Sequence, residues 1–183
     1  LRVIAHSASK AYLDENPELH FHYEGFVNDD DATVLDEEPA VSTTATQSSL
    51  AGVYDVNASG GEDDDYRFVY QGAHLTIGEA AQQVDSFDVA TDAVYGDAAL
   101  QLEATATSGL AVSFVSSNPE VLEVNGTQLK IRGAGAAVIT ASQGGSANFD
   151  AATDLNATVV IHKAELRVIA HSASKAYLDE NPE

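Results

Sequence analysis

Apolar and polar residues alternate over short stretches along most of this chain. The alternating stretches are 19–23, 66–70, 111–115 and 128–132. Two runs rich in β-branched residues, 136–141 and 157–161, have the length of buried strands. A period of two residues is typical of half-buried β-strands, and the helical period is nearly absent. Because turn signals separate the stretches roughly every 8–12 residues, the pattern predicts an all-β protein of the sandwich or barrel type.

Three local signals refine this pattern. A strand expected at 52–56 is followed by turn-forming residues at 57–61. Asn125-Gly126 precedes the stretch 128–132 and predicts a β-hairpin with a type I′ turn, which needs two consecutive residues with positive φ. One short helix is expected at 30–35, because acidic residues at its start favour the positive end of the helix dipole.

Residues 166–183 repeat residues 1–18 without a change, as LRVIAHSASKAYLDENPE. We interpret the repeat as the start of the next copy in a tandem array of near-identical 165-residue units, and duplication of one end during cloning is the alternative. Residues 166–183 are then the first strand of the next repeat. We expect them to form one β-strand that pairs with the preceding domain or with a neighbouring molecule, because an unpaired strand is normally disordered.

A weaker symmetry lies inside the 165-residue unit. The segment 75–80 resembles 159–164, and three residues recur 83 positions later, namely Tyr12, Asp14 and Leu19 as Tyr95, Asp97 and Leu102. The sequence therefore predicts two small β domains in tandem, at 1–80 and 81–165. The first is expected to be β-grasp-like or Ig-like with at most one short helix, and the second to be an Ig-like β-sandwich. No Gly/Ser-rich or Pro-rich linker separates the domains, so we expect a semi-rigid array.

Composition narrows the function. The chain has 29 acidic and 8 basic residues, for a net charge of −21. This charge excludes binding to nucleic acid through the phosphate backbone and disfavours anionic membranes. No apolar run approaches the ~20 residues that span a bilayer, so no membrane insertion is expected. Cysteine is absent, which excludes disulfides and thiol chemistry, and methionine is absent, which indicates a piece of a longer chain.

Acidic residues gather in three clusters, at 29–31, 36–38 and 62–65. Carboxylates in loops suit Ca²⁺, which takes six to eight oxygen ligands. The candidate calcium ligands are Asp29, Asp31, Asp63 and Asp65, with Glu79, Glu165, Asp14 and Glu15 as further candidates near the domain junctions. No cluster matches the EF-hand pattern, and a solvated acidic surface is the alternative interpretation.

Other chemistry finds little support. His20 and His22 share one strand face, which suits two solvated polar residues better than a zinc site. No nucleophile elbow, zinc-protease or phosphate-loop motif occurs, so we do not expect an enzyme. Gly133-Ala134-Gly135 is followed by a strand pattern and is interpreted as a turn.

Several motifs together resemble known families. In residues 1–80 they are Ser9-Lys10-Ala11-Tyr12, Asn16-Pro17-Glu18-Leu19, Gly25-Phe26-Val27-Asn28-Asp29, Gly52-Val53-Tyr54, Asp65-Tyr66 and Leu75-Thr76-Ile77, and this region resembles the MBG domain of bacterial surface proteins. Residues 89–164 are similar to bacterial Ig-like repeats, through Tyr95-Gly96-Asp97, Ser116-Ser117-Asn118-Pro119, Ile139-Thr140-Ala141 and Asn148-Phe149-Asp150. Two positions depart from the family: Leu13 stands where it usually has Gly, and Asp29 stands where a Gly often follows Asn.

The resemblance implies a stalk repeat of a large secreted bacterial adhesin, located outside the cell at the cell surface. Its partners would be the neighbouring repeats of the same chain. The alternative is a binding module for a glycan or a host protein, in which exposed tyrosines stack on sugars. The candidate tyrosines are Tyr12, Tyr23, Tyr54, Tyr66, Tyr70 and Tyr95. A third interpretation is a protein of a cell-wall or matrix lattice.

Overall fold

The computed structural model describes residues 1–172, 174, 176 and 177, and their secondary structure is almost entirely β-strand. The first elements are β1 (Arg2–Ala5), β2 (Ala8–Ala11), β3 (Phe21–Glu24), the 3₁₀ helix η1 (Ala32–Val34), β4 (Ala40–Thr43), β5 (Gly52–Ser59), β6 (Val69–Gln71) and β7 (Ala73–Gly78). They are followed by β8 (Val84–Asp88), β9 (Asp92–Val94), β10 (Leu100–Gln101), β11 (Glu103–Ala106), β12 (Ser113–Ser116), β13 (Leu122–Asn125), β14 (Gln128–Ile131), β15 (Gly135–Ser142) and β16 (Leu155–His162). The all-β prediction is confirmed.

Contacts between residues divide the chain into two compact units. Unit 1 contains Leu1–Phe87, Glu103–Ser113 and Ala141–Leu155, and unit 2 contains Asp88–Leu102, Phe114–Thr140 and the chain from Asn156 onward. Unit 1 therefore includes one loop and two strands from beyond residue 80. The predicted domain boundary after residue 80 stays a prediction.

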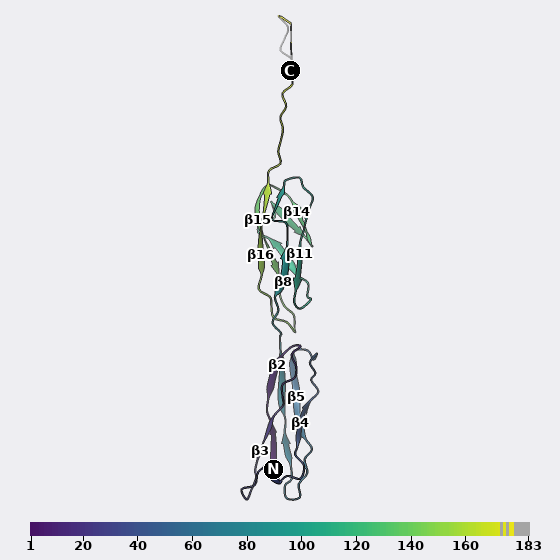
Figure 1. The fold of residues 1–183 in the computed structure, drawn as a ribbon, viewed down its shortest axis with the longest axis vertical. Coiled ribbons are helices and arrows are strands. Elements are labelled where there is room, and N and C mark those ends of the chain that lie inside the picture. The colour runs from purple at the N-terminus through teal and green to yellow at the C-terminus, as the bar shows by residue number, and fades with distance from the viewer. Residues whose placement is uncertain (173, 175, 178–183) are drawn as a thin grey trace. The chain divides into compact units, whose positions relative to one another are not determined.

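Unit 1 contains two sheets made from residues 1–80. The strands β2-β7-β5-β4 form one sheet, and β3-β1-β6 form the other. Figure 1 labels β2, β5 and β4 of the first sheet and β3 of the second. The alternation in β5 and β7 turns Val56, Leu75 and Ile77 inward, where they pack with Ala5 of β1. Because one core holds side chains from both sheets, the first half is an Ig-like sandwich and not a β-grasp fold.

Unit 2 contains most of a second four-stranded sheet, β12-β15-β16-β9, and the three-stranded sheet β10-β14-β13. Leu122 and Leu129 of the hairpin and Ile139 and Val159 of the long strands are fully buried. The remaining pair, β8 and β11, lies in unit 1.

The two four-stranded sheets have one topology. In each, an early short strand lies parallel to the last strand, so β2 pairs with β7 and β9 pairs with β16. In the first sheet β5 lies on the other side of β7, and β4 forms the far edge. In the second sheet β15 lies on the other side of β16, and β12 forms the far edge. The weak sequence symmetry therefore reflects a duplicated strand arrangement.

Three local predictions need correction. The hairpin of β13 and β14 is present, but Asn125 pairs with Gln128 and only Gly126 of the two loop residues has a positive φ, so the turn is not type I′. β5 continues to Ser59, because its residues 56–59 pair with β4, and the turn falls at Gly60-Gly61. The helix expected at 30–35 is the single 3₁₀ turn of η1, whose N-cap is Asp31.

The repeated segment is not a strand in the part that the structure describes. Leu166, Val168 and Ile169 are exposed by 87%, 88% and 65%, whereas Val3, the counterpart of Val168, is fully buried. The expected strand pairing of this segment is therefore wrong for residues 166–172, and residues 173, 175 and 178–183 lie outside the described part. The matching segment β1 is held between β3 and β6, whereas no described strand pairs with residues 166–172.

A tight turn follows the short parallel strand in both halves. Tyr12 N–H donates to Gly78 O at 2.9 Å, and Tyr95 N–H donates to His162 O at 2.8 Å. The next residue has a positive φ in each turn, 70° at Leu13 and 104° at Gly96. A left-handed backbone is unfavourable for a residue with a Cβ, so Leu13 is strained where the equivalent turn has Gly96.

The reciprocal exchange of these two residues tests this strain. We expect Leu13→Gly to raise the free energy of unfolding by about 1 kcal/mol, because Leu13 is half exposed and loses little packing. Gly96→Leu should lower it by a similar amount, since a Cβ at Gly96 meets no atom within 4 Å and only the backbone is strained. Urea unfolding of both variants measures this, and equal effects of the same sign would contradict the explanation.

Candidate functional site

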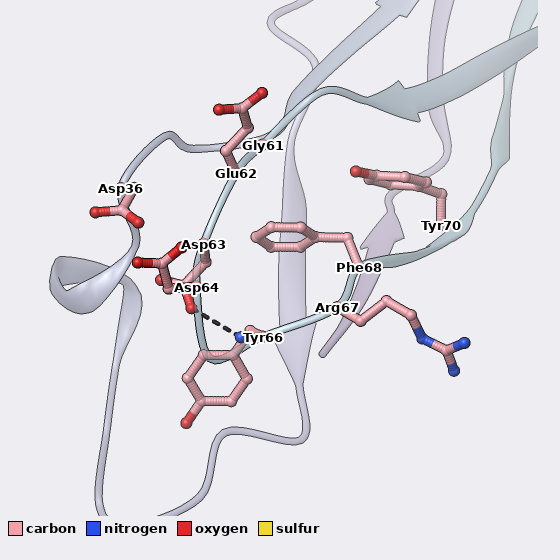
Figure 2. A pocket seen from close by; sticks show the side chains of 9 residues that line it. All are labelled: Asp36, Gly61, Glu62, Asp63, Asp64, Tyr66, Arg67, Phe68 and Tyr70. Atoms are coloured by element: carbon pink, nitrogen blue, oxygen red, sulfur yellow. Dashed lines mark hydrogen bonds between the residues drawn. The ribbon is translucent and has the colours of Figure 1, made fainter.

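The described part of the chain contains an open pocket of about 470 Å³ in unit 1. Its lining residues are Asp36, Gly61, Glu62, Asp63, Asp64, Tyr66, Arg67, Phe68 and Tyr70 (Figure 2). Most of them belong to the loop between β5 and β6, which Gly60 and Gly61 begin with positive φ values. Backbone hydrogen bonds in both directions join Glu37 to Glu62, at 3.0 and 3.1 Å. The structure thus brings two of the three predicted acidic clusters together.

Two of the predicted calcium ligands bind backbone or hydroxyl groups of their own loops. Asp63 Oδ1 accepts hydrogen bonds from the N–H groups of Asp65 and Tyr66, both at 2.8 Å. Asp31 Oδ1 accepts from the hydroxyl of Thr33 at 2.6 Å and from its N–H at 2.9 Å. These hydrogen bonds lower the pKa of Asp31 below its ordinary value of 3.8, and the Thr33 hydroxyl contributes more than the Thr33 N–H. These carboxylates stabilise loop turns.

Tyr66 links the remaining acidic cluster, residues 29–31, to the pocket. Its hydroxyl donates to Asp30 Oδ2 at 2.7 Å and accepts from Val27 N–H at 3.1 Å. The Val27 N–H favours the ionised phenol, but burial, the Asp30 hydrogen bond and the charges of Asp30 and Asp63 together raise the pKa of Tyr66 above 10.0. The phenol therefore stays neutral and remains a donor to Asp30 at physiological pH.

The four predicted ligands do not converge on one point. Asp31 and Asp63 cap turns, and Asp29 and Asp65 are exposed. Among the residues that the structure describes, no group of three or more histidines, aspartates and glutamates is arranged to hold a metal ion. Calcium binding at these residues stays a prediction.

His22 contacts His6, whereas His20, which was expected to share a strand face with His22, lies just before β3. His6 Nε2 lies 2.7 Å from His22 Nδ1, and their ring centroids are 4.9 Å apart. A hydrogen bond between two ring nitrogens needs one donor and one acceptor, so at least one ring is neutral. His20 contributes only its carbonyl, which accepts from His6 N–H at 2.9 Å. The close approach depends on the β1–β3 register, which the sequence does not show.

Aromatic rings form one wall of the pocket. Phe68 and Tyr70 are stacked with an interplanar angle of 15°, and Tyr66 contacts Phe26 edge-on. Figure 2 shows the Phe68 ring between the acidic side chains and Tyr70. Sequence reasoning named Tyr66 and Tyr70 but missed Phe68 and Arg67. The alternate spacing of Tyr66, Phe68 and Tyr70 was the signal that could have identified the wall.

Aromatic faces beside carboxylates can stack on a sugar ring and accept hydrogen bonds from its hydroxyl groups. Arg67 supplies the one positive charge among the lining residues, and Figure 2 shows its side chain directed away from the carboxylates. The pocket lining contains no serine, cysteine or histidine that could serve as a nucleophile with its base.

Two further carboxyl groups meet in unit 1, at Glu79 and Asp150. The backbone of Ala80 pairs with the segment 148–150, which brings these side chains together. A hydrogen bond to Asp150, then burial and then the Asp150 charge raise the pKa of Glu79 above 4.5. Like carboxylates this close share a proton more readily than they ionise together.

Glu79→Gln tests this carboxyl pair. The folded state binds the Glu79 proton more tightly than the unfolded chain does. The protonated pair therefore stabilises the folded state below pH 4.5, and this stabilisation is lost as the pH rises through the raised pKa of Glu79. We expect Glu79→Gln to raise the Tm at pH 7 and to change it little at pH 4. Glu103→Gln, on the exposed face of β11, serves as the control and should leave the pH dependence unchanged. A Tm gain confined to pH 4 would contradict the assignment.

Tyr23 gives a second prediction, because its buried hydroxyl has no hydrogen-bond partner among the described residues. Burial and then the charge of Glu38 raise its pKa above 10.0. We expect Tyr23→Phe to stabilise the protein by about 1 kcal/mol, since it removes an unsatisfied polar group. Tyr54→Phe is the matched control: the Tyr54 hydroxyl donates to Leu50 O at 2.9 Å, and its loss should destabilise. Thermal melts measure both variants, and a Tyr23→Phe loss equal to that of Tyr54→Phe would refute the prediction.

Comparisons with solved structures give only distant likenesses. Drosophila N-cadherin EC1-3 is 10% identical with a TM-score of 0.34, and the match covers 90% of this chain and 68% of that one. Drosophila N-cadherin EC1-4 is also 10% identical, with a TM-score of 0.33, and the match covers 90% of this chain and 48% of that one. None of the curated proteins matches this chain. No helix in the described residues has the length and apolar character to cross a membrane.

A family model gives a specific match to the first half. The model of the MBG domain (YGX type) matches residues 1–76. The matched region contains the turn at Tyr12-Leu13-Asp14, and the counterpart at Tyr95-Gly96-Asp97 has the glycine that Leu13 replaces. The match indicates a β domain of the extracellular adhesion type. The resemblance to an MBG domain is therefore confirmed over residues 1–76.

Proposed function

We propose that this chain is a spacer repeat of a large bacterial surface adhesin, whose tandem units hold a distal binding domain away from the cell. The observation that carries the proposal is the recurrence of residues 1–18 at 166–183. A chain that begins the same domain again after 165 residues is arranged as an array. We expect no catalytic activity.

The strand arrangement supports a spacer in another way. Both halves have the same four-stranded sheet order, so the array repeats one kind of sandwich. The linker between β16 and the counterpart of β1 is short and contains only residues 163–166. A linker this short restricts the angles between successive domains. The charge of −21 keeps successive units soluble and opposes lateral association.

Chains of one, two and three units test the spacer. Small-angle X-ray scattering of each chain gives the maximum dimension, and we expect an equal increment for every added unit, because a short linker keeps the units extended. The same multi-unit chains with a Gly/Ser-rich linker in place of residues 163–166 provide the flexible control. A maximum dimension that grows only with the square root of the unit number, as in the control, would contradict the proposal.

The pocket of Figure 2 favours a second candidate, a glycan-binding module. The stacked Phe68 and Tyr70 rings and the surrounding carboxylates are the specific observation. Glycan-array binding by the 183-residue chain that is lost in Phe68→Ala would favour this candidate over a pure spacer. Val115→Ala, an exposed apolar residue of β12 outside the pocket, is the control.

A further inference from the structure

Two residues of the loop between β15 and β16 occupy a defined site in unit 1. Asn148 Oδ1 accepts from Ala51 N–H at 2.9 Å, and Asn148 O accepts from Ala80 N–H at 2.8 Å. Phe149 forms a β-bridge with Ala80, and its ring meets the ring of Tyr12 edge-on, with centroids 5.4 Å apart. Asn148 and Phe149 are thus bound by the ring of Tyr12 and by the backbones of Ala51 and Ala80.

The three residues that bind Asn148-Phe149 have counterparts later in the chain. Tyr12 corresponds to Tyr95, Ala51 to Ala134 and Ala80 to Ala164. The two tyrosines begin the equivalent turns, and Ala51 and Ala134 each precede the glycine that opens a long strand, with φ of 157° at Gly52 and 148° at Gly135. The sequence symmetry and the local geometry give the same correspondence.

The second set of residues forms a pocket of about 370 Å³ within unit 2. Its lining is Tyr95, Arg132, Gly133, Ala134, Lys163 and Ala164. Tyr95 is exposed by 51%, whereas its counterpart Tyr12 is half-buried against Phe149. The pocket therefore has the backbone groups and the ring that bind Asn148-Phe149 in unit 1.

The bound pair Asn148-Phe149 has a counterpart as well. Asp65-Tyr66 lies 83 residues before Asn148-Phe149, and each pair follows a Gly-Gly sequence that ends a long strand. Both pairs have the same local turn: Asn148 N–H donates to Ser146 Oγ at 3.2 Å, and Asp65 N–H donates to Asp63 Oδ1 at 2.8 Å. Asp65 is exposed and is the chemical equivalent of Asn148 as a hydrogen-bond acceptor.

Charge complementarity points to the same pairing. The pocket contains Arg132 and Lys163, two of only 8 basic residues, where the filled site has Ser49 and Glu79. The loop of Asp65 carries four carboxylates at 62–65 and one guanidinium at Arg67, where the loop of Asn148 has Ser146 and Ala147. Arg132 already binds Glu123, and no described residue forms an ion pair with Lys163.

We propose that the pocket of Tyr95, Ala134 and Lys163 binds the Asp65-Tyr66 loop of a second copy of this chain, namely the unit that starts at Leu166. The inference rests on the proposed array. Ala134 N–H donates to the Asp65 carboxylate, Ala164 pairs with Tyr66, and the Tyr66 ring lies against Tyr95. The unit boundary is then built like the contact between Ala80 and Phe149. The short tether raises the effective concentration of the incoming loop.

Cysteine cross-linking tests this contact, because the chain has no native cysteine. The protein is a two-unit chain, residues 1–165 followed by the full 183 residues. It carries Ala134→Cys in the first unit and Asp65→Cys in the second. We expect a disulfide under mild oxidation, formed roughly tenfold faster than in the control with Asp55→Cys, an exposed residue of β5, in place of Asp65→Cys. Ala51→Cys with Asn148→Cys in the 183-residue chain calibrates the geometry of the filled site.

Two further readouts make the result decisive. Lys163→Glu in the first unit should slow the cross-link several-fold, whereas Lys130→Glu, outside the pocket, should not. Amide hydrogen exchange at Ala134 and Ala164 should be slower in the two-unit chain than in the 183-residue chain. Unchanged exchange together with cross-linking no faster than the control would overturn the inference. If the two-unit chain still lengthens by a full increment, the spacer function survives that failure.

Discussion

The parallel pairing of an early strand with the last strand is the constraint on which each half of this protein depends. β2 aligns with β7 over Ala8–Ala11, and β9 aligns with β16 over Asp92–Val94. The pairing joins residues far apart in sequence and places the start of each half beside its end. In a parallel pair, tension on the start of one strand and the end of the other loads all the hydrogen bonds together. In the proposed spacer role, this arrangement would resist tension along the chain.

In the proposed array, the same topology would limit unwanted pairing between copies of the unit. The edge strands of the two four-stranded sheets are short, with 4 residues in β2, β4 and β12 and 3 in β9, whereas β5, β15 and β16 have 8 residues each. A short edge offers few free backbone groups to another sheet. The net charge of −21 adds electrostatic repulsion between copies. Both features suit the proposed array of repeated β domains.

The periodic parts of the sequence predicted the fold well. Alternation located β3, β12 and β14, and apolar runs located β15 and β16, each within a few residues. The recurrence of Tyr12 and Asp14 as Tyr95 and Asp97 indicated the shared topology. The choice between a β-grasp and an Ig-like first half was not decidable from the pattern, because it depends on which strands share a core. The type I′ turn was wrong because strand register, and not the Asn-Gly pair, fixes which residues form the loop.

The candidate site was predicted less completely. Residue type identified the acidic clusters, but the roles of Asp31 and Asp63 depend on local hydrogen bonds that the composition does not specify. The His6–His22 contact and the Tyr66–Asp30 bond depend on tertiary register. Residues 166–172 were expected to form a paired strand, but no described strand holds them in the way that β3 and β6 hold β1.

Single-molecule pulling on the first half tests the parallel pairing most directly. With cysteine handles at Leu1 and Ala81, force enters before β2 and leaves after β7, and the paired strands are loaded in shear. With handles at Leu13 and Ala81, the same strands are pulled from neighbouring ends and their hydrogen bonds break in sequence. We expect a clearly higher unfolding force for the first geometry. Equal forces in the two geometries would show that the β2–β7 pair does not bear the load.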